Sequence, residues 1–155
     1  MFTWLQETSL AEWIQVSLYG WAIMLTFHAV GTATAVGVNF VAGLRLVGLF
    51  PKIPYTAVGK LINLVWVAFA VNLISGFCLF ASNAVMYTQD VMFLLKLLFI
   101  AIGLGATYHL QKLIKKDGAN WDSAGNASAD SFKIAVAVLA LWAVVILVAR
   151  LIAYL

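Results

Sequence analysis

Hydrophobic residues fill four long stretches of the chain, and charges rarely interrupt them. Each stretch supplies the roughly 20 apolar residues that a helix needs to cross a membrane. None shows the polar–apolar alternation of membrane β-barrel strands. The sequence therefore predicts an all-α integral membrane protein whose single domain, residues 1–155, is a bundle of four transmembrane helices. We place the spans at about residues 13–49, 57–80, 91–110 and 133–154.

The first stretch is longer than one crossing requires. A helix over residues 13–49, rising about 1.5 Å per residue, exceeds the hydrocarbon thickness of roughly 30 Å, so it must tilt, bend or protrude. The run Ser9-Leu10-Ala11-Glu12 has the pattern of a capping box and predicts that this long first helix begins there. The connections at residues 50–54 and 115–131 are too short for a further domain.

Charge gives a predicted orientation. Of all residues 65% are hydrophobic and only 10% are charged, and the basic ones gather around the first and third connections. By the positive-inside rule, both termini then face outward, which is the periplasm for a multi-pass protein of the bacterial inner membrane. The net charge of +3 reflects this topology, so we expect membrane lipid, and not nucleic acid, at these lysines.

Two histidines, His28 and His109, are predicted to lie within the spans. Polar side chains are costly in hydrocarbon and mark functional sites, and imidazole is a good ligand for haem iron. A flat macrocycle lying against a helix also needs small neighbouring side chains. Such neighbours share a face with each histidine: Gly31 and Ala35 beside His28, and Gly105 and Ala106 beside His109.

Other interpretations of these residues stay open. The small residues also suit close packing between helices, and the histidines suit interhelical hydrogen bonds. Met24 and His28, one turn apart, could present a thioether and an imidazole to copper. A carrier of small solutes or ions, or a membrane assembly subunit, would need no cofactor.

The mid-span His28 and the run Leu44-Arg45-Leu46-Val47-Gly48-Leu49 resemble a family of small four-helix bacterial inner-membrane haem proteins. That family is loosely akin to membrane b-type cytochromes and CopD-like proteins. The resemblance covers most of the chain and implies haem b, held by His28 and His109, and electron transfer within or across the membrane. The sequence does not identify the redox partner, for which a quinone and another cytochrome are both open. Members of the family tend to have an acidic residue where this chain has Gly43.

The number of haems, one or two per chain, depends on how deep each of the two histidines lies in the membrane. If Arg45 and Lys112 mark the same membrane surface, the two histidines differ in depth by roughly 20 Å at about 1.5 Å per residue. One arrangement has a single haem clamped between both imidazoles. The other has two haems at different depths, each with one histidine from the chain.

Supporting roles are expected for other polar residues. Asn39 or Asn72 is expected to bond an imidazole N–H. Arg45 and Lys112, near the inner interface, could receive the propionates of a haem bound at His109. Tyr108 is expected to shape the pocket of His109, whereas Lys96 is expected at the outer interface or in a subunit contact. Four helices offer little surface to cover a cofactor, so we expect a homo-oligomer, a dimer or trimer, with close contacts at Gly37 and Gly43.

Overall fold

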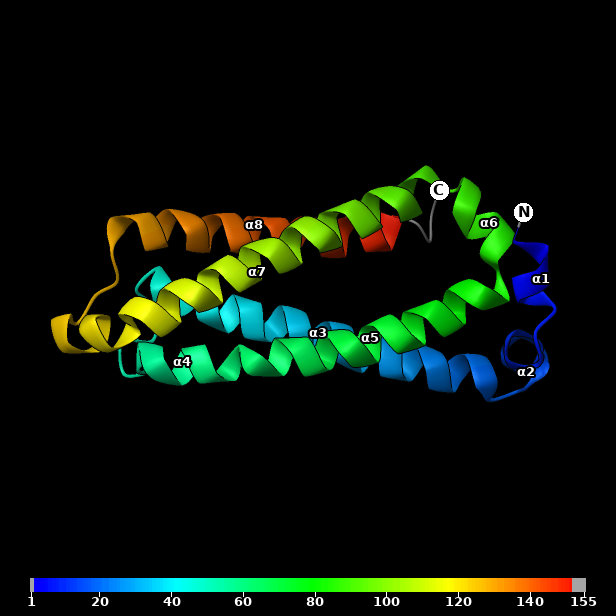
Figure 1. Cartoon of the computed structure of the whole chain (residues 1–155), viewed down its shortest axis with the longest axis horizontal. Coiled ribbons are helices and arrows are strands. Elements are labelled where there is room, and N and C mark those ends of the chain that lie inside the picture. Colours follow the sequence, from blue (N-terminus) through cyan, green and yellow to red (C-terminus); the bar gives the residue numbers. More distant parts are fainter. Residues whose placement is uncertain (1, 152–155) are drawn as a thin grey trace.

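Four helical stretches run along the long axis of the molecule (Figure 1). The computed structural model describes residues 2–151, and these residues form no β-strand. Four stretches are long and apolar enough to cross a membrane, which confirms the prediction of a multi-pass membrane protein. They are α3 (Gly20–Leu46), α4 (Tyr55–Leu61) with α5 (Asn63–Ser82), α7 (Val91–Ala124) and α8 (Ala129–Leu151). The predicted end of the fourth span, residues 152–154, lies outside the described residues.

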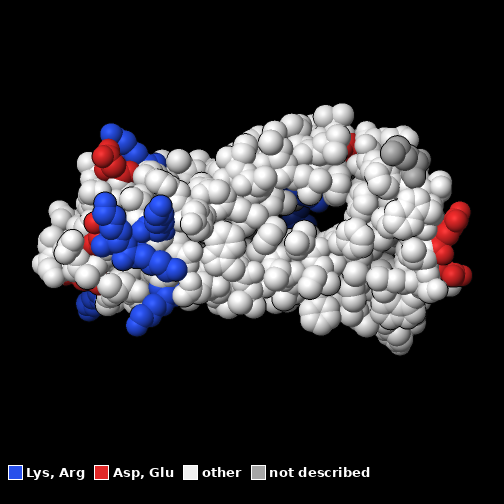
Figure 2. Space-filling view, viewed as in Figure 1, with Lys and Arg blue, Asp and Glu red and all other residues white. Residues whose placement is uncertain are grey.

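The two ends of the bundle differ in structure and charge. Three short helices gather at the amino-terminal end: α1 (Thr3–Gln6), α2 (Ser9–Val16) and α6 (Ala84–Gln89). Lysine and arginine side chains gather at the opposite end, which we call the basic end (Figure 2). Its exposed lysines are Lys52, Lys60, Lys112, Lys115, Lys116 and Lys133.

The prediction of one long first helix is wrong, because the chain turns sharply after α2. Ser17 takes an extended conformation (φ −71°, ψ 134°), and its hydroxyl oxygen accepts a hydrogen bond from the Gly20 N–H at 3.2 Å. A side chain at Gly20 would place its Cβ 2.8 Å from the Trp13 carbonyl oxygen, so this turn needs glycine. The helix before the turn does begin at Ser9, as predicted, but Thr8 is its capping residue.

The third span is longer than predicted. The polar residues after Leu110, expected to form a connection, continue α7 as far as Ala124, and Gly125 ends it in the left-handed conformation (φ 81°). This extension packs on the start of α4. Trp121 contacts the Tyr55 ring edge-on, and the Asp122 carboxylate accepts hydrogen bonds from the Tyr55 and Thr56 N–H groups. Contacts far apart in sequence therefore keep this polar segment helical.

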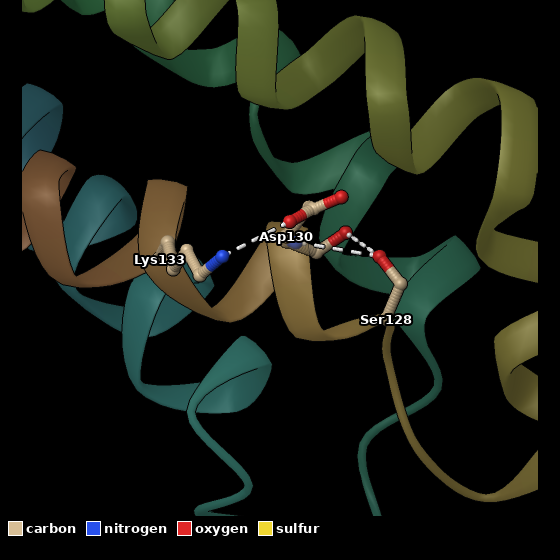
Figure 3. A network of polar contacts seen from close by, with 4 residues as sticks. Ser128, Asp130 and Lys133 are labelled. Atoms are coloured by element: carbon tan, nitrogen blue, oxygen red, sulfur yellow. Dashed lines mark hydrogen bonds and ion pairs between the residues drawn. The ribbon is translucent and has the colours of Figure 1, made fainter.

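The last helix begins earlier than predicted. The Ser128 hydroxyl accepts a hydrogen bond from the Ser131 N–H at 3.3 Å, as a capping residue does, and lies 2.7 Å from the Ser131 hydroxyl (Figure 3). Lys133 forms an exposed ion pair with Asp130 at 3.3 Å. These polar groups start α8 at Ala129, four residues before the apolar run at which the fourth span was expected.

The core contains a layer of buried polar groups. The Asn39 side chain is fully buried on α3 and donates to the Ala35 carbonyl oxygen at 2.9 Å. The Thr107 hydroxyl of α7 lies 2.8 Å from Asn39 Oδ1 and accepts a hydrogen bond from the Trp142 indole N–H of α8. Three spanning helices are thus joined at one level of the bundle.

Candidate functional site

His28 lies on the face of α3 that packs against α5. Its Nδ1 is 3.1 Å from the Asn72 carbonyl oxygen and 3.4 Å from the Ser75 hydroxyl. The ring rests against Gly76, where an added Cβ would lie 2.9 Å from His28 Cε1. An Nδ1–H donated to a carbonyl fixes the tautomer with a free electron pair on Nε2. Among the described residues no protein group forms a hydrogen bond with Nε2.

The Asn72 side chain fixes α3 against α5 at this point. Its amide nitrogen donates to the His28 carbonyl oxygen at 2.9 Å and to the Thr32 hydroxyl. The predicted contact between Asn72 and His28 is therefore present, but the backbone carbonyl of Asn72, and not its amide, binds the imidazole. His28 and Asn72 are thus joined by two hydrogen bonds, one from the imidazole to the Asn72 carbonyl and one from the Asn72 amide to the His28 carbonyl. Together they hold the imidazole in one orientation.

The bundle is open in its amino-terminal half. Helices α5 and α7 diverge toward the amino-terminal end (Figure 1), and Figure 2 shows a hole through this half of the molecule with basic side-chain atoms inside it. The first part of α7 has no buried residue before Gly103. Lys96, on this part of α7, is half-buried. The amino-terminal half of the bundle therefore contains both the fixed imidazole of His28 and open space between helices.

The small residues predicted to border a macrocycle beside His28 are used for helix packing. A Cβ on Gly31 would lie 2.9 Å from the Ala68 carbonyl oxygen of α5. Ala35 is buried in the main hydrophobic core. These contacts leave no space for a ligand over Gly31 and Ala35.

Asn39 and Arg45 lie away from His28. The amide of Asn39 is bonded to Ala35 and Thr107, about 16 Å below His28 at about 1.5 Å per residue. Arg45 is buried at the basic end, where it donates to the Ile53 carbonyl oxygen and the Tyr55 hydroxyl. Both side chains therefore bond within the fold: Asn39 was expected to bond an imidazole, and Arg45 to receive a propionate of a haem bound at His109.

The second histidine lies on the outside of the bundle. His109, Tyr108 and Gly105 are exposed, and nothing lies within 4 Å of a Cβ built on Gly105. Ala106 is half-buried, and the Tyr108 ring meets Trp66 edge-on at 6.5 Å. Among residues 2–151 no other element covers His109, whose exposed face is open to lipid or to a second copy.

The two histidines lie at different depths. The bond between Thr107 and Asn39 places these residues at one level. His28 lies eleven residues before Asn39 on α3, and His109 two residues after Thr107 on α7, which runs in the same direction. At about 1.5 Å per residue the imidazoles are roughly 20 Å apart along the bundle. One iron within one chain cannot bind both, so of the two arrangements only separate sites fit.

Two residues of this site were not selected from the sequence: Ser75 and Gly76. Ser75 and Gly76 follow Asn72 by three and four residues and so share its helical face, which is the signal that could have found them. Between residues 2 and 151, no three His, Cys, Asp or Glu side chains come together to hold a metal ion.

Gly37 and Gly43, expected at subunit contacts, have different surroundings. Gly37 is exposed with open space beside it, whereas Gly43 is buried against Leu139 of α8, 2.6 Å from an added Cβ. Gly43 therefore serves packing within the chain.

Comparison of the sequence and structure with protein-family models, curated proteins and solved structures finds no match.

Proposed function

We propose that this membrane protein binds haem b through His28 and exchanges electrons near the amino-terminal end of the bundle. The observation that carries the proposal is the orientation of the imidazole. Its Nδ1 is held by the Asn72 carbonyl oxygen, and its Nε2 has no protein partner in the part of the chain described. Histidines that bind metals have this arrangement, with the second ring nitrogen bonded to a carbonyl or carboxylate.

A macrocycle suits this site better than a bare metal ion. A protein site for copper or zinc needs several His, Cys, Asp or Glu ligands. At this site, His28 is the only residue of these types among the described residues that bond one another. Haem supplies four ring nitrogens of its own and needs only axial ligands from the protein. When bound, it supplies a one-electron couple whose potential depends on those ligands and their surroundings.

The residues of the chain have defined tasks in this proposal. His28 binds the iron, Asn72 fixes the tautomer and orientation of the ring, and Gly76 leaves space for the ring against α5. We place the protein in the bacterial inner membrane with the basic end toward the cytoplasm, as the positive-inside rule favours. The partner in electron transfer would then be a quinone or another cytochrome that reaches the periplasmic side, where the amino-terminal end of the bundle lies.

Haem content of histidine variants tests the proposal. We expect purified parent protein and His109→Ala to carry haem b, and His28→Ala to carry none, because only His28 is oriented by a neighbouring helix. The measurement is the pyridine haemochrome per chain, with the reduced α band as a second readout. Since His109 is exposed and unbonded in the described structure, His109→Ala is the matched control for loss of an imidazole.

Two results would contradict the proposal. The first is protein that stays colourless after saturation with haem, which would favour a carrier without a cofactor. The second is haem content that depends on His109 and not on His28. To separate ligation from folding, His28→Gly is supplied with free imidazole, which should restore the spectrum if the variant is folded and the iron lacks only its ligand.

A further inference from the structure

A groove lies between α4 and α7 at the basic end of the bundle, where these helices are side by side (Figure 1). Its volume is about 220 Å³, and it is lined by Thr56, Gly59, Lys60, Asn63, Ile114 and Lys115. The helices touch at its base, where a Cβ added to Gly59 would lie 2.8 Å from Ile114 Cγ2. Lys60 and Lys115 are exposed, so two ammonium groups from distant parts of the chain border one groove.

A chain of hydrogen bonds fixes the orientation of the Asn63 amide. The Trp66 indole N–H can only donate, and it donates to Gln111 Oε1 at 3.0 Å. The amide nitrogen of Gln111 is therefore directed to Asn63 Oδ1, to which it donates at 2.7 Å. The Asn63 amide nitrogen keeps two N–H groups, for which residues 2–151 provide no acceptor. Asn63 thus brings unused donors to the groove.

The lysines of the groove are also free of protein partners. In the described part of the chain, neither ammonium group forms a hydrogen bond, and the ion pair found there joins Lys133 to Asp130 instead. The carboxylate bonded to a lining residue is that of Asp122, which already accepts from the hydroxyl and the N–H of Thr56. Two cations and an amide donor suit a ligand that carries negative charge and acceptor oxygens.

The groove lies at the depth of lipid headgroups. Helix α7 has 34 residues, and at about 1.5 Å per residue it is longer than the hydrocarbon core of roughly 30 Å. The third span was predicted to end at Leu110, and Lys115 lies about 7 Å further along the helix. The headgroup layer extends roughly 5 to 7 Å beyond the core on each side. Lys115 therefore reaches the layer that contains lipid phosphates.

We propose that this groove binds the phosphate group of an anionic phospholipid, with Lys60 and Lys115 pairing with the phosphate oxygens and Asn63 donating a hydrogen bond. A phosphodiester has one negative charge and only acceptor oxygens, which match these donors. The exposed apolar residues Leu64 and Val67 continue the helical face of Lys60 toward the hydrocarbon and provide a surface for the acyl chains. This site is separate from His28 and does not depend on haem.

Native mass spectrometry of the purified full chain, titrated with phosphatidylglycerol, measures the affinity for the first bound lipid. We expect Lys60→Gln combined with Lys115→Gln to bind it roughly 25-fold more weakly than the parent, because each lysine near a lipid phosphate contributes about fivefold. Lys52→Gln combined with Lys116→Gln is the matched control. It removes the same charge from exposed lysines of the basic end that do not line the groove, and should bind as the parent does.

A third variant tests the amide donor. Asn63→Asp keeps an acceptor for the Gln111 amide and replaces the free donor with a carboxylate oxygen. It should weaken phosphatidylglycerol binding at least about fivefold, although it changes the net charge by no more than the loss of one lysine. Binding as tight as in the parent would show that Asn63 does not face the lipid phosphate.

The control variants separate a built site from general attraction. Equal weakening in the two double variants would mean that the lipid follows the total charge of the basic end, and would overturn the proposal. Equal affinity of the parent for phosphatidylcholine and phosphatidylglycerol would overturn it too. Inorganic phosphate, added with phosphatidylcholine as the lipid, distinguishes the source of the phosphate. We expect no bound phosphate, and binding that requires Lys60 and Lys115 would assign the groove to the free ion and not to a lipid.

Discussion

Replacing Gly31 with leucine is expected to lower the free energy of unfolding by about 3 kcal/mol, the upper end for overpacked sites. The Cβ would fall 2.9 Å from the Ala68 carbonyl oxygen and 3.1 Å from the Asn72 backbone nitrogen. Backbone atoms cannot rotate away as a flexible side chain can, so α3 and α5 must separate. His28 lies one turn away on the same helix, so the variant should also lose the contact between its imidazole and Asn72.

Denaturant unfolding in micelles, followed by circular dichroism, measures this loss. Gly37→Ala is the matched control, because Gly37 lies on the same helix with nothing within 4 Å of an added Cβ. Alanine there should leave stability unchanged or raise it by up to about 1 kcal/mol, the helix-propensity difference from glycine. Equal stability of Gly31→Leu and the parent would show that α3 and α5 do not pack as described.

Replacing Asn39 with alanine is expected to lower the free energy of unfolding by about 2 kcal/mol. The change leaves a cavity at a fully buried position and removes a partner of the Thr107 hydroxyl. Because Thr107 also contacts Trp142, the loss should loosen α3, α7 and α8 together.

A double-mutant cycle with Thr107→Val isolates the bond between the two side chains. We expect a coupling energy between Asn39→Ala and Thr107→Val of about 0.6 to 1.7 kcal/mol, as for interhelical hydrogen bonds in membranes. Strictly additive effects would mean that the two residues do not share a hydrogen bond. Fluorescence of Trp142 in the single variants gives a local readout of the same contact.

The spans were predictable because hydrocarbon thickness leaves few alternatives for a long apolar run. The helix ends were not, since they depend on contacts distant in sequence. Ser17 is unremarkable in the sequence, yet its hydroxyl accepts from Gly20 and breaks the expected long helix. The polar end of α7 was expected to form a connection because nothing local shows that Trp121 and Asp122 contact the start of α4.

The site was predictable only in part. His28 and Asn72 were selected because polar groups in a span attract attention, and the structure does bring them together. The sequence could not show which way each helix face turns. A small residue such as Gly31 suits both a neighbouring macrocycle and close helix packing. Only the position of α5 against Gly31 distinguishes the two uses.

The bond between Asp122 and the beginning of α4 has a consequence for biosynthesis. The Tyr55 N–H donates to a carboxylate that follows it by 67 residues, on a helix made after α5. During translation, the first two spans enter the membrane before this acceptor exists. Their connection at the basic end therefore reaches its final geometry only when the ribosome has passed Asp122. A chain that stalls earlier would expose these amides to water and present an unfinished hairpin to the quality-control proteases.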